Sequence, residues 1–143
     1  MILFFLEEAT ISTALTVTID GHINKDFYPA DERGEDCIPW ELQSFSKIKG
    51  LCFDLIKGKH TPLYFKFVLH MQPDKAATML TKAQVDPDVI RALVLNIRYD
   101  GEKTVLTTGC AYQVFTMDKS ADTAWDKALK KYLDLKGISY EEL

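Results

Sequence analysis

The residues with the clearest chemical potential are basic and lie just after a predicted helix. The stretch Gly58-Lys59-His60-Thr61 is similar to the end of a phosphate-binding loop, where backbone amides and a lysine hold phosphate oxygens. It lacks the first glycine of that motif, and it follows a helix, whereas a phosphate loop precedes one. A structural interpretation fits better, because Lys57 and Lys59 complement the negative end of the helix and Gly58 terminates it.

The same lysines belong to a wider basic cluster. Its members are Lys47, Lys49, Lys57, Lys59 and His60. Such a patch attracts nucleic-acid phosphates, and binding through it would weaken steeply with salt. The chain as a whole carries a net charge of −4, which argues against a protein that binds nucleic acid by bulk charge. A nucleic-acid-associated accessory protein is therefore an alternative hypothesis.

The three histidines lack the spacing of metal ligands. None of His22, His60 and His70 has a second histidine or cysteine three or four residues away. Asp20, His22 and Asp26 lie close in sequence and could share one side of a strand. Dedicated metal sites have more ligands than this, so the sequence predicts no metal and no cofactor.

The cysteines predict ordinary thiols. Cys52 and Cys110 fall on apolar faces of predicted elements, and Cys37 lies beside an acidic loop that makes it a poor nucleophile. The absence of a CxxC pair is typical of reduced thiols in the cytosol. The sequence also lacks the signatures of serine hydrolases, zinc proteases, dinucleotide-binding folds and phosphate loops, so we expect no catalytic residues.

One strand presents a mixed polar face. Residues 63–71 alternate between an apolar side and a side with Tyr64, Lys66 and His70. If helices cover the apolar side, the mixed side stays open and can bind a ligand or partner. The candidate binding residues are Lys57, Lys59, His60, Tyr64, Lys66 and His70. The aromatic residues Trp40, Tyr64 and Tyr112 offer another groove, although such side chains more often pack in the core.

The predicted elements follow the order three strands, helix, strand, helix, two strands, helix. The first strands are residues 2–11, 15–19 and 23–28, and a helix follows from about Ser46 with one face formed by Ile48, Leu51, Cys52, Leu55 and Ile56. This order predicts one α+β domain over residues 1–143, with an antiparallel or mixed sheet of about six strands and three helices mainly on one face. Residues 63–99 could form a right-handed crossover.

A hairpin and a long helix end the chain. Asp100-Gly101 suits a two-residue turn, which would pair Ile97 with Thr104 and Leu95 with Leu106. Asp118 is the expected N-cap of the helix, and Gly137 is the expected left-handed residue at its end. One apolar stripe runs along this helix: Ala121, Ala124, Trp125, Ala128, Leu129, Tyr132 and Leu133.

The length and composition are those of an ordinary globular domain. The chain has 143 residues, of which 47% are hydrophobic and 27% charged. The apolar start at Met1 stops at Glu7, too soon for a signal peptide, and there is no apolar run long enough for a transmembrane helix. We expect a cytoplasmic protein with no membrane partner.

Three segments resemble a family of uncharacterised bacterial proteins, a domain of unknown function found in clostridia and their relatives. They are residues 8–13 with 18–28, residues 52–62, and residues 115–120 with 124–127. The resemblance implies a shared fold and supplies no activity. Family members carry a further amino-terminal segment, which would fit the apolar start of this chain.

The first functional hypothesis is a non-catalytic cytosolic binding or interaction protein that self-associates as a homodimer or binds a protein partner. Its basis is the missing catalytic signatures and the apolar first strand, which would leave an edge or face to be covered. A third hypothesis is a small-molecule enzyme whose site is assembled from distant residues, which would need a cleft with carboxylates or histidines.

Overall fold

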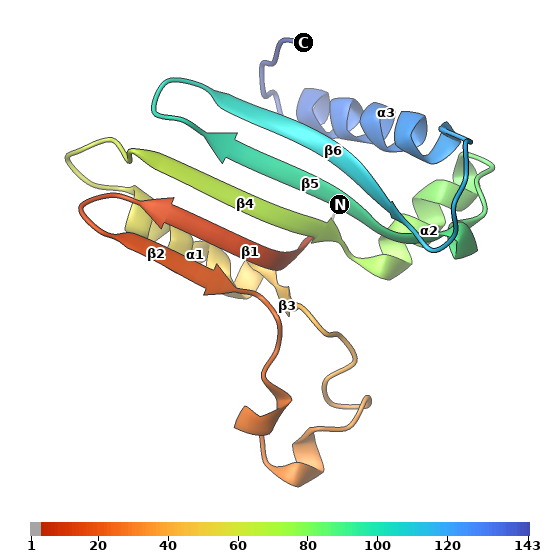
Figure 1. Ribbon diagram of the computed structural model, residues 1–143, viewed down its shortest axis with the longest axis horizontal. Coiled ribbons are helices and arrows are strands. Elements are labelled where there is room, and N and C mark those ends of the chain that lie inside the picture. Colours follow the sequence, from red (N-terminus) through yellow and green to blue (C-terminus); the bar gives the residue numbers. More distant parts are fainter. Residues whose placement is uncertain (1–3) are drawn as a thin grey trace.

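The computed structural model describes residues 4–143 and forms one antiparallel sheet (Figure 1). Its strands are β1 (Phe4–Ser12), β2 (Thr16–Asp20), β3 (Gln43–Ser44), β4 (Tyr64–Met71), β5 (Ile90–Tyr99) and β6 (Thr104–Tyr112). The sheet order is β2-β1-β4-β5-β6, and β3 also pairs with β1. This confirms the α+β prediction. Residues 2 and 3 of the predicted first strand lie outside the described residues.

Two helices cover one face of the sheet, and within residues 4–143 the opposite face carries no helix (Figure 1). These are α1 (Phe45–Ile56) and α3 (Ser120–Leu135), while α2 (Pro73–Lys82) joins β4 to β5 at one end of the sheet. The short helices are η1 (Lys25–Phe27), η2 (Ala30–Glu32) and η3 (Pro87–Val89). The crossover proposed for residues 63–99 is wrong, because β4 and β5 are antiparallel neighbours. The chain between these strands forms α2 and η3, and it returns to the same end of the sheet, where an antiparallel neighbour begins.

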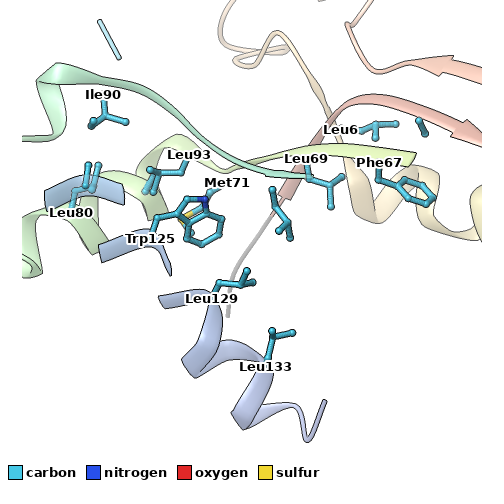
Figure 2. Close-up of a cluster of buried hydrophobic side chains, with 14 of the residues drawn as sticks. Leu6, Phe67, Leu69, Met71, Leu80, Ile90, Leu93, Trp125, Leu129 and Leu133 are labelled. Atoms are coloured by element: carbon cyan, nitrogen blue, oxygen red, sulfur yellow. The ribbon is translucent and has the colours of Figure 1, made fainter. Parts of the chain in front are cut away.

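The core lies between the sheet and its helices. Trp125 is fully buried and, with Leu129 and Leu133, points from α3 toward the sheet (Figure 2). The Trp125 indole Nε1–H donates to the Val94 carbonyl of β5 at 2.8 Å, which satisfies the one polar group of this large side chain. The predicted stripe of α3 is therefore confirmed as the face that packs on the sheet.

Two details of the helices differ from the predictions. Leu51 is 56% exposed and lies outside the buried face of α1, because it sits about 100° around the helix from the buried Cys52. Asp118 precedes the flanking residue Lys119, yet its carboxylate still accepts from the Ser120 amide at 2.9 Å. Asp118 therefore makes the expected contact with the first turn of α3, although Lys119 and not Asp118 is the N-cap residue. Gly137 has the expected positive φ of 69°.

The β5–β6 hairpin keeps the predicted faces but not the predicted register. Ile97 pairs with Leu106 and Tyr99 with Thr104, so the connection contains four residues and not two. The Asp100 carboxylate accepts from the amides of Glu102 and Lys103 at 2.9 and 3.0 Å, which closes this wider turn. A shift of two residues restores the same side chains to the same face, since the side-chain period of a strand is two.

The third predicted strand is wrong. Residues 25–27 form η1, and the segment between β2 and β3 projects away from the sheet (Figure 1). The chain returns as β3, which pairs with Phe5 and Leu6 of β1. A β-bulge at Glu7 separates this pairing from that of β2, which begins at Glu8. The first strand is therefore central, with neighbours on both of its edges.

Candidate functional site

An apolar cleft lies at the end of the sheet where β4 leads into α2. Its volume is about 310 Å³, at the lower end of the range typical of small-ligand pockets, which is about 300–1,000 Å³. Its residues come from β1, the segment before β3, β4, α2, η3 and β5. They are Phe5, Pro39, Trp40, Glu41, Leu42, His70, Met71, Pro73, Ala76, Ala77, Leu80, Pro87, Ile90, Arg91 and Ala92. Within that set, the charged or titratable groups are Glu41, His70 and Arg91.

Two β-bulges bring charged side chains to this end of the sheet. The register of β1 shifts between Leu6 and Glu8, so Glu7 is the extra residue, and the register of β5 shifts between Ile90 and Ala92, so Arg91 is extra. Bulges redirect side chains that regular alternation would place elsewhere. Here they flank β4, the strand between β1 and β5.

His70 lies near the end of β4, opposite Phe5 of β1 and Val94 of β5. Its Nε2 lies 3.2 Å from a carboxylate oxygen of Glu7, and its side chain is 23% exposed. A carboxylate on one ring nitrogen fixes the orientation of the ring and selects the tautomer. His70 is therefore held in place at the cleft by a residue 63 positions away in the chain.

Trp40 forms one aromatic wall of the cleft. Its ring centroid lies 5.3 Å from that of Phe5, tilted by 51°, a favourable geometry for an aromatic pair. Backbone bonds hold the segment that carries Trp40 against the residues that follow β2: the Ile23 amide donates to the Glu41 carbonyl and the Gln43 amide to the Gly21 carbonyl, both at 2.8 Å. The wall is thus positioned by regular strand pairing on either side of the projecting segment.

The structure separates the predicted site residues into three places. His70 lines the cleft, and Lys66 lies further along the helix-free face of the same strand. Tyr64 begins β4, roughly 20 Å from His70 along the strand. Lys57, Lys59 and His60 are exposed in the segment before β4, at the end of the sheet away from the cleft.

The aromatic groove suggested for Trp40, Tyr64 and Tyr112 is wrong. Trp40 lines the cleft from the segment before β3, whereas Tyr64 begins β4 and Tyr112 ends β6. Tyr112 donates its hydroxyl hydrogen to the Asp122 carboxylate of α3 at 2.5 Å. This bond raises the pKa of Tyr112 above its ordinary value, because ionisation would place two negative charges in contact. A second bond, from the Thr108 hydroxyl to Asp126, also joins β6 to α3. These two hydrogen bonds attach α3 to β6, so Tyr112 has a structural role there.

Sequence reasoning missed Phe5, Glu7 and Arg91. Phe5 belongs to the general apolar pattern of the first strand, and the alternation of side chains alone does not place it in a cleft. A weak signal exists in the pair Glu7-Glu8, because two consecutive acidic residues interrupt a strand that otherwise alternates.

The structure shows the surroundings of His22, the histidine considered as a metal ligand. His22 Nδ1 lies 2.6 Å from Asp20 on an exposed surface, and this contact raises the pKa of His22. Asp26 belongs to η1. Within these residues no group of three histidine, cysteine or acidic side chains is placed to hold a metal ion.

The three thiols give a direct check on burial. Cys52 is buried, with 2% of its surface exposed, and Cys37 is exposed. Burial and the nearby Asp122 charge raise the pKa of Cys110 to about 12. Very little of Cys110 is therefore thiolate near neutral pH, and the thiolate is the form that reacts with a disulfide. We expect a disulfide reagent to titrate one thiol rapidly in the native protein and three in denaturant. The Cys37→Ser variant should lose the rapid phase, and two rapid thiols in the native protein would contradict this burial.

In the described part of the chain, no helix is long and apolar enough to cross a membrane. Searches of curated proteins and of solved structures found no match. One family model does match, described as a family of unknown function (DUF5721), and the match runs over residues 3–141. Since the match covers nearly the whole chain, the protein belongs to this family of unknown function.

Proposed function

We propose that this chain is a non-catalytic binding protein whose ligand places an apolar group in the cleft. The observation that carries the proposal is the cleft itself: a concave apolar surface with an aromatic wall and a few converging polar groups. Phe5 and Trp40 would contact the apolar group. Arg91 and His70 would orient the ligand by hydrogen bonds, since both can donate to an acidic or carbonyl oxygen.

The lining supports binding over covalent catalysis. Among the residues that form the cleft there is no serine, threonine or cysteine to act as a nucleophile. The Glu7–His70 contact provides the carboxylate and histidine that the enzyme hypothesis needs. In a binding protein the same contact has a simpler role, because it orients a ring at the entrance to an apolar surface.

Two further parts of the proposal concern setting and assembly. The free thiols of Cys37, Cys52 and Cys110 support a reducing compartment such as the cytosol. Self-association stays a prediction. Within residues 4–143, β1 has neighbouring strands on both of its edges, so an uncovered edge of this strand does not support it.

Binding of anilinonaphthalene sulfonate, an apolar aromatic anion, tests the cleft. We expect the probe to bind the folded protein and to change the emission of Trp40. The Ala77→Leu variant should weaken binding at least tenfold, because the leucine fills part of the cleft. The Arg91→Gln variant should weaken it about tenfold through loss of a charge-assisted bond.

The matched control is Thr81→Leu, which adds a leucine to an exposed position of the same helix. It should bind the probe as the original chain does. Equal affinities for the Ala77→Leu and Thr81→Leu variants, with both folded, would contradict the proposal.

A further inference from the structure

The end of the sheet away from the cleft carries exposed apolar side chains. Three connections meet there (Figure 1): β1 to β2, α1 to β4, and β5 to β6. Leu15 is 63% exposed, Leu63 68%, and Phe53 at the end of α1 61%. The Leu63 amide donates to the Ser12 carbonyl at 2.9 Å, which places the first two connections side by side. Large apolar groups gathered in this way mark an interaction surface more often than isolated ones do.

Basic side chains lie on the same surface. Lys57 and Lys59 are exposed in the segment after α1, and Lys57 Nζ lies 5.4 Å from the centre of the Phe53 ring. Lys49 precedes Phe53 by one helical turn and is also exposed. Asp54 pairs with Lys57 at 3.1 Å, and the β5–β6 connection carries the exposed Asp100 and Glu102, so acidic groups offset part of this charge. We call Leu15, Phe53, Lys57, Lys59 and Leu63 the basic apolar end.

We infer that the basic apolar end docks on the surface of an anionic lipid bilayer. A bilayer interface offers anionic headgroups to lysines and an apolar layer to leucine and phenylalanine within a few ångströms of each other. Nucleic acid would satisfy the lysines, and a base could stack on Phe53, but it offers no apolar medium to the aliphatic Leu15 and Leu63. The exposed leucines therefore favour lipid as the partner.

This contact is a surface contact and needs no spanning helix. It differs from the sequence-based expectation, which had no membrane partner and gave these lysines to nucleic acid as an alternative. Because the cleft lies at the other end of β4, a docked molecule would keep the cleft open to solution.

Vesicle co-sedimentation tests the inference with two lipid compositions: phosphatidylcholine alone, and phosphatidylcholine with one third phosphatidylserine. We expect binding to the anionic vesicles at low salt, with a steep decrease as salt is added. Lys57→Gln together with Lys59→Gln should weaken partitioning about 30-fold, and Leu15→Ser together with Leu63→Ser about tenfold or more. All these positions are exposed, so the variants should keep the original melting temperature.

Matched controls use the same changes elsewhere. Lys127→Gln with Lys131→Gln removes two exposed lysines from α3, and Leu135→Ser removes a leucine that is 76% exposed; both should bind vesicles as the original chain does. No binding to anionic vesicles at low salt would overturn the inference. So would binding of a single-stranded oligonucleotide that depends on the lysines but is unaffected by the leucine changes, because that result assigns the surface to nucleic acid.

Discussion

Replacing Trp125 with alanine is expected to lower the free energy of unfolding by about 4 kcal/mol. Trp125 is completely buried between α3 and the sheet, and the surrounding side chains belong to different elements that cannot all move into the space it leaves. The Val94 carbonyl would also lose its 2.8 Å hydrogen bond from the indole. Urea unfolding followed by circular dichroism measures the change without relying on tryptophan emission.

Two variants separate the contributions to this loss. Trp125→Phe keeps an aromatic ring but removes the donor, so it should cost less than the alanine variant. Leu135→Ala, at an exposed position near the end of the same helix, should change stability by less than about 0.5 kcal/mol. A loss below about 1 kcal/mol for Trp125→Ala would mean that α3 does not pack on the sheet through this side chain.

Replacing Gly21 with alanine is expected to prevent folding or to destabilise the protein by at least about 3 kcal/mol. A Cβ atom at Gly21 would lie 1.8 Å from the carbonyl oxygen of Leu6 and 2.5 Å from its carbonyl carbon. Both are backbone atoms of the central strand. Backbone bonds hold Gly21 on both sides, since its amide donates to Glu7 at 2.9 Å and its carbonyl accepts from Gln43.

Gly50→Ala provides the matched control for this change. Gly50 lies within α1, and a Cβ atom there would have no neighbour within 4 Å. Alanine should stabilise the helix by about 0.5–1 kcal/mol. The two variants therefore make the same chemical change with opposite expected signs. A Gly21→Ala protein that melts with the original chain would show that the bulge in β1 is not formed as described.

The parts of the fold that depend on local pattern could be predicted from the sequence. Alternation in residues 63–71 and 93–99 gives β4 and β5 their buried faces, and the stripe around Trp125 gives the face of α3. A prediction of which side chains face the core stays correct when the pairing of two strands is wrong by an even number of residues. The hairpin was wrong by two residues and still placed Leu95 and Ile97 on the correct face, because a strand repeats every two residues.

The candidate site could not be predicted in the same way. Glu7 and Arg91 reach the cleft region through bulges, which depend on how neighbouring strands pair and not on the local alternation of side chains. Trp40 reaches the cleft because the segment after β2 leaves the sheet and returns as β3, where a third long strand was expected. His70 was singled out as part of a polar strand face, and only the assembled sheet shows its contact with Glu7.

The claim at the centre of this account is that ligands bind in the cleft between β4, β5 and α2. Two-dimensional amide NMR spectra recorded during titration with anilinonaphthalene sulfonate locate the bound probe directly. We predict that the largest shifts belong to Phe5, Trp40, His70, Ala77 and Arg91, with little change in the basic apolar end. Saturable binding whose shifts gather outside these residues, or no shift at all at high probe concentration, would contradict the claim.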